Sequence, residues 1–368
     1  MAGFPFMRQA EAFRSSLPFI LLLAVFILPC PMSAAAKPRP AIAFVHLLLP
    51  PGGEPHASPA GWIGSLDRAR DTLESLRIPT IVSSASPGNA EDLNELSEMD
   101  PEVLITTSPL LYAAACDVAK RSPNTVFFAC TDETVHDNMS GFQARTYEAH
   151  YLAGLIAGAL SEDGVIGYLA NDPYQSKASR LRNANAFTLG AQKSKAAIRV
   201  LYAPGNDPDE ELKTLIAAGA DIVDLERALP SLVERLREHS VRYVGTAGRT
   251  VDPLCLAAPE WEWSNAFGDL LTQVRFGIWR PRNVSYGIKE GVVGLSPFGP
   301  AVPETVRVRV REAKEAIRNG ASPFEGPVRD VSGSLRIAEG SVPDDATLRG
   351  MDWRVQVLEP LPLTPDGL

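Results

Sequence analysis

Short apolar runs alternate with segments of helical spacing along most of the chain. AIAFVHLLL (41–49), VLITTS (103–108) and GVIGYLA (164–170) are typical of strands buried on both faces. Helical patterns occur over residues 64–77, 109–122, 147–160, 178–193, 208–219 and 229–239. Gly154 and Gly158 have the spacing that permits close packing of one helix against another. The alternation predicts an α/β protein with parallel sheets and right-handed crossovers.

The alternation divides into two series. About nine short strands are predicted, which is more than one small doubly wound sheet usually holds. We therefore expect two sheets, with a break near residues 144–147. Ligands of such folds bind at the carboxyl ends of the strands. Turn-rich loops follow the strands there, among them HLLLPPGGEPHASPAGW (46–62) and LANDPYQS (169–176).

The N-terminal residues have the pattern of a secretory signal peptide. Arginines precede the apolar run LPFILLLAVFILP (17–29), which is too short to span a bilayer comfortably. Ala34 and Ala36 stand where signal peptidase requires small residues. We predict a signal peptide over residues 1–36, cleavage near Ala36, and export to the periplasm.

The cysteines leave two questions open. Cys30 offers an alternative lipid anchor, but such a site requires small residues before the cysteine, and a Leu-Pro pair stands there. Cleavage would leave Cys116, Cys130 and Cys255. In an oxidising compartment this odd number allows a Cys116–Cys130 disulfide with one free thiol. Three small buried thiols are an equal alternative.

Charge and motifs argue against several classes of function. The net charge of −9 and the pI near 5.2 argue against nucleic-acid binding. The sequence has no HExxH, CxxC, GxxxxGK[ST] or GxSxG motif, and its five histidines are scattered. Pro297 disrupts the near-match GLSPFG (294–299). We therefore expect no metal, no cofactor and no enzyme activity, and an exported binding protein instead.

A set of longer motifs resembles the basic membrane protein (BMP) family of ABC-transporter substrate-binding proteins. The longest is ARTYEAHYLAGLIAGALSEDGVIGYLA (144–170). The others follow the family's order: AGWIGSLDRAR (60–70), NAFTLGAQ (185–192), LIAAGADIV (215–223), APEWEW (258–263), KEGVVGLSPFGPAVP (289–303), PFEGPVRD (323–330) and GMDW (350–353). Each motif is weak alone, but the ordered set extends over most of residues 41–355.

The resemblance implies a type I periplasmic-binding-protein fold, with two Rossmann-like lobes and a ligand cleft between them. Three crossovers would join the lobes, near residues 144–147, 247–253 and 286–291. The implied lobe one comprises residues 41–145 plus 250–288. Lobe two comprises residues 146–249 plus 289–355, and residues 356–368 form a C-terminal tail. Characterised family members are receptors for purine nucleosides or bases that serve an ABC importer. The resemblance thus implies a monomer that binds a small flat ligand and docks on an inner-membrane permease.

The resemblance also carries over candidate ligand contacts. Trp62 would stack on a flat ring, worth about 1–3 kcal/mol, unless it packs against a helix instead. Arg182 and Asn185 match polar positions on a helix of lobe two, where an amide suits the edge of a base. A pair on the helix surface is their alternative. Trp263 matches one of two paired tryptophans, with packing in lobe one as its alternative, and Arg249 places a cation at the second crossover.

Acidic residues that the family has near the ligand are missing from this sequence. Their positions hold Pro59, Ser179, Ala228, Ala247 and Arg249. Each lost carboxylate removes a hydrogen bond worth about 1.5–3 kcal/mol, for which Glu226 and Arg227 are candidate substitutes. We therefore expect an altered ligand with an anionic or acceptor-rich group. The alternatives are an ordinary purine receptor with contacts from other loops, and a degenerate binding protein that acts as a sensor or envelope interaction protein without transport.

Overall fold

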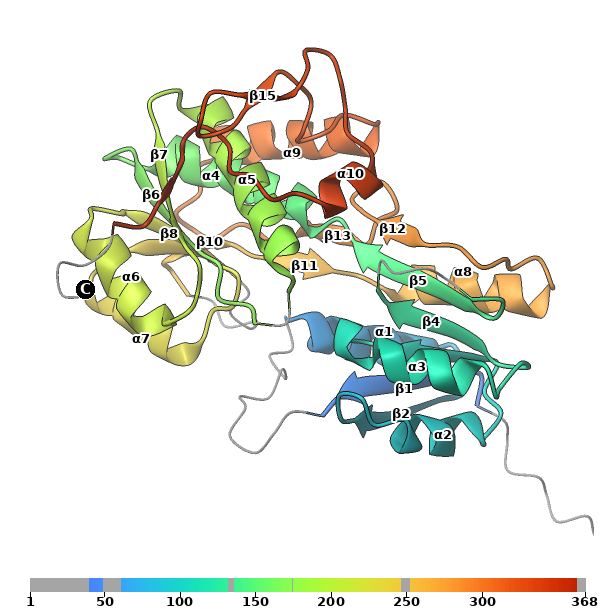
Figure 1. Ribbon diagram of the computed structural model, residues 1–368. Coiled ribbons are helices and arrows are strands. Elements are labelled where there is room, and N and C mark those ends of the chain that lie inside the picture. The colour runs from blue at the N-terminus through green and yellow to red at the C-terminus, as the bar shows by residue number, and fades with distance from the viewer. Residues whose placement is uncertain (1–39, 49–60, 132–135, 174, 246–251, 363–368) are drawn as a thin grey trace, which may run out of the picture. The chain divides into compact units, whose positions relative to one another are not determined.

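The computed structural model describes residues 40–48, 61–131, 136–173, 175–245 and 252–362 (Figure 1). The predicted signal peptide, the alternative anchor at its cysteine and the predicted contact at the second crossover all lie outside these residues. No helix in the described part of the chain is long and apolar enough to cross a membrane.

Six parallel strands form the first sheet, in the order β12-β5-β4-β3-β1-β2. They are β1 (Ile42–Leu47), β2 (Thr80–Ala85), β3 (Val103–Thr106), β4 (Val126–Cys130), β5 (Met139–Ala144) and β12 (Val284–Tyr286). Alternate residues of a strand face opposite sides of its sheet. Helices α1 (Trp62–Ser75) and α8 (Ser264–Arg275) bury one side. The other side packs on α2 (Glu91–Ser97), the short helix η1 (Pro109–Leu111) and α3 (Tyr112–Ala119).

A second sheet of six parallel strands has the order β10-β9-β8-β6-β7-β16 (Figure 1). Its strands are β6 (Val165–Leu169), β7 (Arg199–Ala203), β8 (Ile222–Leu225), β9 (Arg242–Gly245), β10 (Cys255–Ala257) and β16 (Leu358–Pro360). One side packs on α4 (Thr146–Leu160), α5 (Lys177–Ser194) and α9 (Glu304–Arg318). The other packs on α6 (Pro208–Ala217) and α7 (Pro230–Glu238). These two parallel sheets confirm the predicted α/β fold with two lobes.

Glycines allow α4 and α5 to approach closely. A Cβ atom on Gly154 would lie 1.9 Å from a backbone oxygen of α5, and one on Gly158 would lie 2.3 Å from another. Gly190 of α5 faces α4 in the same way, with a backbone oxygen 2.1 Å from its would-be Cβ. The predicted role of the Gly154 and Gly158 spacing in helix packing is therefore confirmed.

Two segments belong to the second sheet although the sequence placed them elsewhere. Strand β10 lies within residues 250–288, which were assigned to lobe one, yet it pairs with β9. Strand β16 lies within the expected tail, residues 356–368, yet it pairs with β7. Each has only three residues, which is too short for a recognisable apolar pattern. The second passage between the sheets thus follows β10 and comes later than residues 247–253.

Short antiparallel pairs complete the second and third passages and the C-terminal region. Strand β11 (Pro259–Trp261) pairs with β13 (Val293–Leu295), so these two passages lie side by side. Strand β14 (Val328–Arg329) pairs with β15 (Leu335–Ile337), and α10 (Asp345–Arg349) follows them.

No disulfide joins the three cysteines in the described part of the chain. Cys130 is buried, and Cys116 and Cys255 are half-buried. The Sγ atom of Cys116 contacts the Sδ atom of Met139 at 4.0 Å. The Cys116–Cys130 disulfide is absent, and the alternative of separate small thiols is the one observed.

Candidate ligand-binding site

A histidine marks the carboxyl edge of the first sheet. His46 lies near the end of β1, with Nδ1 3.2 Å from Thr107 Oγ1 and Nε2 3.3 Å from Asp67 Oδ1. Burial lowers the pKa of His46 and outweighs the opposite effect of Asp67. The Thr107 hydroxyl in turn donates to the carbonyl of Val45 at 3.1 Å. His46 was not predicted as a site residue, although a polar residue inside an apolar strand was a visible signal.

Trp62 begins α1 beside this histidine cluster. Its Nε1 donates to the carbonyl of Thr107 at 2.8 Å. Its ring stacks near Phe142, with centroids 6.4 Å apart, and meets the edges of Trp261 and Trp263 at 5.8 and 5.3 Å. The residue is half-buried. Trp62 therefore packs in lobe one and keeps exposed surface at the carboxyl edge of the first sheet, and its contact with a ligand stays a prediction.

Trp263 has no surface to offer a ligand. Its exposed fraction is 0%, because its ring packs on Trp62, Phe142, Phe267 and Tyr286. The ligand-contact prediction for Trp263 is corrected accordingly, and packing in lobe one is the observed alternative. Sequence alone does not distinguish the two roles, because both require a large aromatic side chain.

Asn185 and Arg182 hold the C-terminal segment in place. Asn185 is fully buried, donates from Nδ2 to Trp353 O at 2.8 Å, and accepts at Oδ1 from Val355 N at 2.9 Å. Arg182 is buried, donates to Leu348 O at 3.2 Å, and stacks over Tyr147. Neither matches the expected ligand contact or the alternative of a surface pair. Their partners lie more than 160 residues further along the chain, so local sequence gave no sign of them.

The carboxyl edge of the second sheet carries a set of polar groups around Glu226. This residue follows β8 and accepts from the Tyr168 hydroxyl at 2.9 Å and from Asp172 N at 3.4 Å. Asn171 fixes the adjacent loop, since its side chain makes two bonds of 2.8 Å to the backbone of Arg227. Burial raises the pKa of Glu226 to about 7. Its carboxyl group therefore exists in both protonation states near neutral pH.

A buried ion pair lies next to Glu226. His150 Nδ1 is 3.2 Å from Asp224 Oδ2, and both side chains are almost fully buried. Burial favours the neutral ring, but the interaction with Asp224 outweighs burial and raises the pKa of His150. The other carboxylate oxygen, Asp224 Oδ1, has no hydrogen-bond partner among the described residues. The carboxyl edge of this sheet is thus strongly polar beneath its surface.

Two of the predicted acidic losses fall within the described residues. The Ser179 hydroxyl accepts a hydrogen bond from the Arg182 guanidinium, and the Ser179 backbone N–H donates to the Ser176 hydroxyl at the start of α5. Ala228 is half-buried in the loop that contains Glu226. No group of three or more possible metal ligands occurs in the described ranges.

A charged cluster joins the first and third passages between the sheets. Arg145 binds Asp345 in α10 at 2.8 Å and Glu290 at 3.3 Å. Glu148 accepts from Ile288 N at 2.6 Å, and burial raises the pKa of Glu148 to about 7. The cluster thus ties together two of the passages between the sheets.

Comparisons with known proteins agree with the motifs found in the sequence. A family model described as ABC transporter substrate-binding protein PnrA-like (Bmp) matches residues 66–217. A purine-binding protein of Brucella abortus is 28% identical over 340 residues, covering 88% of this chain and 94% of the relative. A protein of Haloferax volcanii named as an ABC transporter glucose-binding protein is 28% identical over 307 residues, covering 77% and 78%.

Solved structures match the fold. An ABC transporter solute-binding protein from Conexibacter woesei has a TM-score of 0.62 at 16% identity, covering 76% of this chain and 97% of that one. One from Aeropyrum pernix has a TM-score of 0.59 at 16% identity, covering 81% and 95%. At such identities the likeness concerns the fold alone. Motifs and family model agree: over residues 66–217 the chain is similar to the PnrA-like (Bmp) ABC transporter substrate-binding proteins.

Proposed function

We propose that this protein is the periplasmic solute-binding component of an ABC importer, and that it binds a small flat ligand of the purine or nucleoside class. The ligand would bind between the carboxyl edges of the two sheets. The receptor would act as a monomer and deliver the ligand to an inner-membrane permease. The family supports the receptor role. The relative from Brucella abortus, which is named as purine-binding, supports the ligand class.

The observation that carries the ligand assignment is the position and chemistry of Glu226. It lies at the end of a central strand of the second sheet, two residues before the position where the family has an acidic residue and this chain has Ala228. With a pKa near 7, its carboxyl group accepts from a ring N–H when ionised and donates to a ring nitrogen when protonated. Purines present both kinds of group. Glu226 would thus replace an acidic contact that the sequence lacks.

Trp62 supports a flat ligand rather than a specific one. Its N–H already donates to Thr107, so only the exposed part of the ring is available to a ligand. Contact through a ring face selects shape and polarisability, and it tolerates different bases. Arg249, which lies outside the described residues, stays a predicted contact.

Ligand identification tests the proposal. Native mass spectrometry of the purified protein should reveal a co-purifying solute, and isothermal titration with hypoxanthine, guanosine and glucose should rank the classes. Saturable binding of a purine compound supports the proposal. Binding of glucose alone would assign a sugar ligand and refute the purine class. Absence of any bound solute in both measurements would favour the degenerate, non-transporting alternative.

Glu226→Gln tests the carboxyl contact separately. Glutamine resembles the protonated acid but has no second state, so the variant should bind with an affinity that is nearly constant between about pH 5 and pH 8. The wild-type affinity should change across that interval. Glu359→Gln, an exposed change in the same lobe, is the matched control and should behave as wild type. Equal pH dependence in all three proteins would remove Glu226 from the site.

A further inference from the structure

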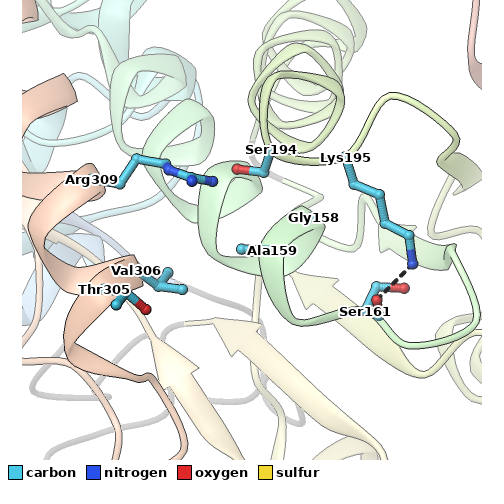
Figure 2. A pocket seen from close by; sticks show the side chains of 8 residues that line it. All are labelled: Gly158, Ala159, Ser161, Ser194, Lys195, Thr305, Val306 and Arg309. Atoms are coloured by element: carbon cyan, nitrogen blue, oxygen red, sulfur yellow. Dashed lines mark hydrogen bonds between the residues drawn. The ribbon is translucent and has the colours of Figure 1, made fainter.

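A hollow lies at the amino edge of the second sheet. Its volume is about 400 Å³, and its walls come from the last turns of α4 and α5 and the first turns of α9 (Figure 2). Helix α4 ends shortly before β6 begins, and α5 ends shortly before β7 begins. The hollow is therefore at the amino edge of the sheet, whereas Glu226 is at the carboxyl edge. It is separate from the candidate ligand-binding site.

The walls carry positive charge without a carboxylate. They are formed by Gly158, Ala159, Ser161, Ser194, Lys195, Thr305, Val306 and Arg309. Within the ranges that the structure describes, neither Lys195 nor Arg309 forms an ion pair with a carboxylate. The nearby carboxylates have partners of their own: Glu162 binds Arg242 at 3.3 Å, and Glu304 binds Arg311. Both cations therefore lie in the hollow without a carboxylate in its walls.

Lys195 is held in position by the end of α4. Its Nζ donates to Ser161 O at 2.9 Å and to Glu162 O at 3.1 Å. An ammonium group has three donors, so these two bonds leave one hydrogen for another acceptor. The contacts also fix the Lys195 side chain, so less conformational entropy is lost when a ligand binds.

Hydroxyl groups and a helix start add further donors. Ser161 Oγ accepts from Gly164 N at 3.0 Å, so its own hydrogen is available. Thr305 lies in the first turn of α9, where backbone N–H groups lack partners within the helix and favour negative charge. Arg309 follows Thr305 by four residues and therefore shares its face. Figure 2 shows the Arg309 guanidinium pointing across the hollow toward Ser194.

We propose that this hollow binds a phosphate group, carried either by a soluble phosphate ester or by the headgroup of an anionic phospholipid. Arginine and lysine together with hydroxyl donors are the usual partners of phosphate oxygens. A volume of about 400 Å³ accommodates more than the phosphate itself and falls in the range of small-molecule pockets. This site is independent of the imported solute, because it lies at the other edge of the sheet.

Titration of the mature protein with inorganic phosphate tests the shared chemistry. Wild type should bind saturably by isothermal titration or by chemical shifts of α9 amides. Sulfate should compete, and chloride at equal ionic strength should not. Arg309→Gln should weaken binding at least about tenfold, the loss expected for one charge-assisted contact. Arg318→Gln removes the same charge from the same helix outside the hollow, and it should leave binding unchanged.

Vesicle sedimentation distinguishes the two sources. A lipid headgroup is identified if vesicles that contain phosphatidylglycerol bind wild type but not Arg309→Gln, and if inorganic phosphate competes with this binding. Phosphate binding without vesicle binding identifies a soluble ester. The proposal is overturned if wild type binds neither probe, if Arg309→Gln binds as wild type does, or if Arg318→Gln loses binding equally. Circular dichroism of both variants confirms that each is folded.

Discussion

Replacing Asn185 by alanine distinguishes a structural role from a ligand contact. The side chain is fully buried and bonds to the backbone of Trp353 at 2.8 Å and of Val355 at 2.9 Å. Val355 is 1% exposed, so water cannot replace the lost partner there. Each buried backbone group left without a partner costs about 1–3 kcal/mol. We expect Asn185→Ala to lower the free energy of unfolding by about 2–5 kcal/mol.

Urea denaturation followed by tryptophan fluorescence measures this loss. Asn183→Ala is the matched control, because Asn183 is a buried asparagine of the same helix whose side-chain amide donates to the Gln175 side chain at 3.0 Å. That partner can turn to water, so the control should lose about 1 kcal/mol. Solute affinity below the unfolding transition should be unchanged in both variants. A variant at position 185 with wild-type stability and abolished solute binding would refute the structural role.

Three further changes give defined expectations. Burial raises the pKa of Glu226 from 4.5 to about 7, so the folded state favours the protonated acid. Relative to Glu226→Gln, wild type should therefore lose up to about 3 kcal/mol of stability as pH rises from about 4.5 to 7. A difference in urea midpoints that does not change with pH would contradict this. Arg145→Gln removes two half-buried ion pairs and should lower the free energy of unfolding by about 1–3 kcal/mol and speed amide exchange at both passages. The exposed change Arg199→Gln should cost under about 0.5 kcal/mol. Equal effects would show that the Arg145 cluster does not stabilise the passages. Gly154→Ala places a Cβ 1.9 Å from a backbone oxygen and should lower the melting temperature sharply. Gly268 has open space around it, so Gly268→Ala should be neutral or stabilise the protein by up to about 1 kcal/mol. If the protein tolerates both changes, the close packing of α4 on α5 is contradicted.

The layered fold was predictable because both faces of each sheet are covered. Strands buried on both faces read as continuous apolar runs, and this is why Ile42–Leu47 and Val165–Leu169 were recognised. The three-residue strands β10 and β16 were not, because their pairing depends on neighbours rather than on their own pattern. The division of the chain into lobes was therefore misplaced at those two points.

The site was less predictable than the fold. Trp62 was located at the correct edge, but matching a family motif did not show that Trp263 is buried or that Asn185 binds the C-terminal segment. A buried amide and a ligand-facing amide use the same donors and acceptors. His46 and Glu226 are polar residues at or after apolar strands, and only the fold shows that each lies at a carboxyl edge.

Solute titration of Trp62→Ala tests whether the first lobe contacts the ligand through this ring. Trp279→Ala is the control, because this tryptophan is also half-buried against the same apolar cluster but follows α8, at the amino edge of the sheet. If the protein is a receptor whose first lobe contacts a flat ligand through Trp62, the affinity for the solute should fall by about 1–3 kcal/mol in Trp62→Ala alone. Unchanged affinity in folded Trp62→Ala, or an equal loss in Trp279→Ala, would contradict the account.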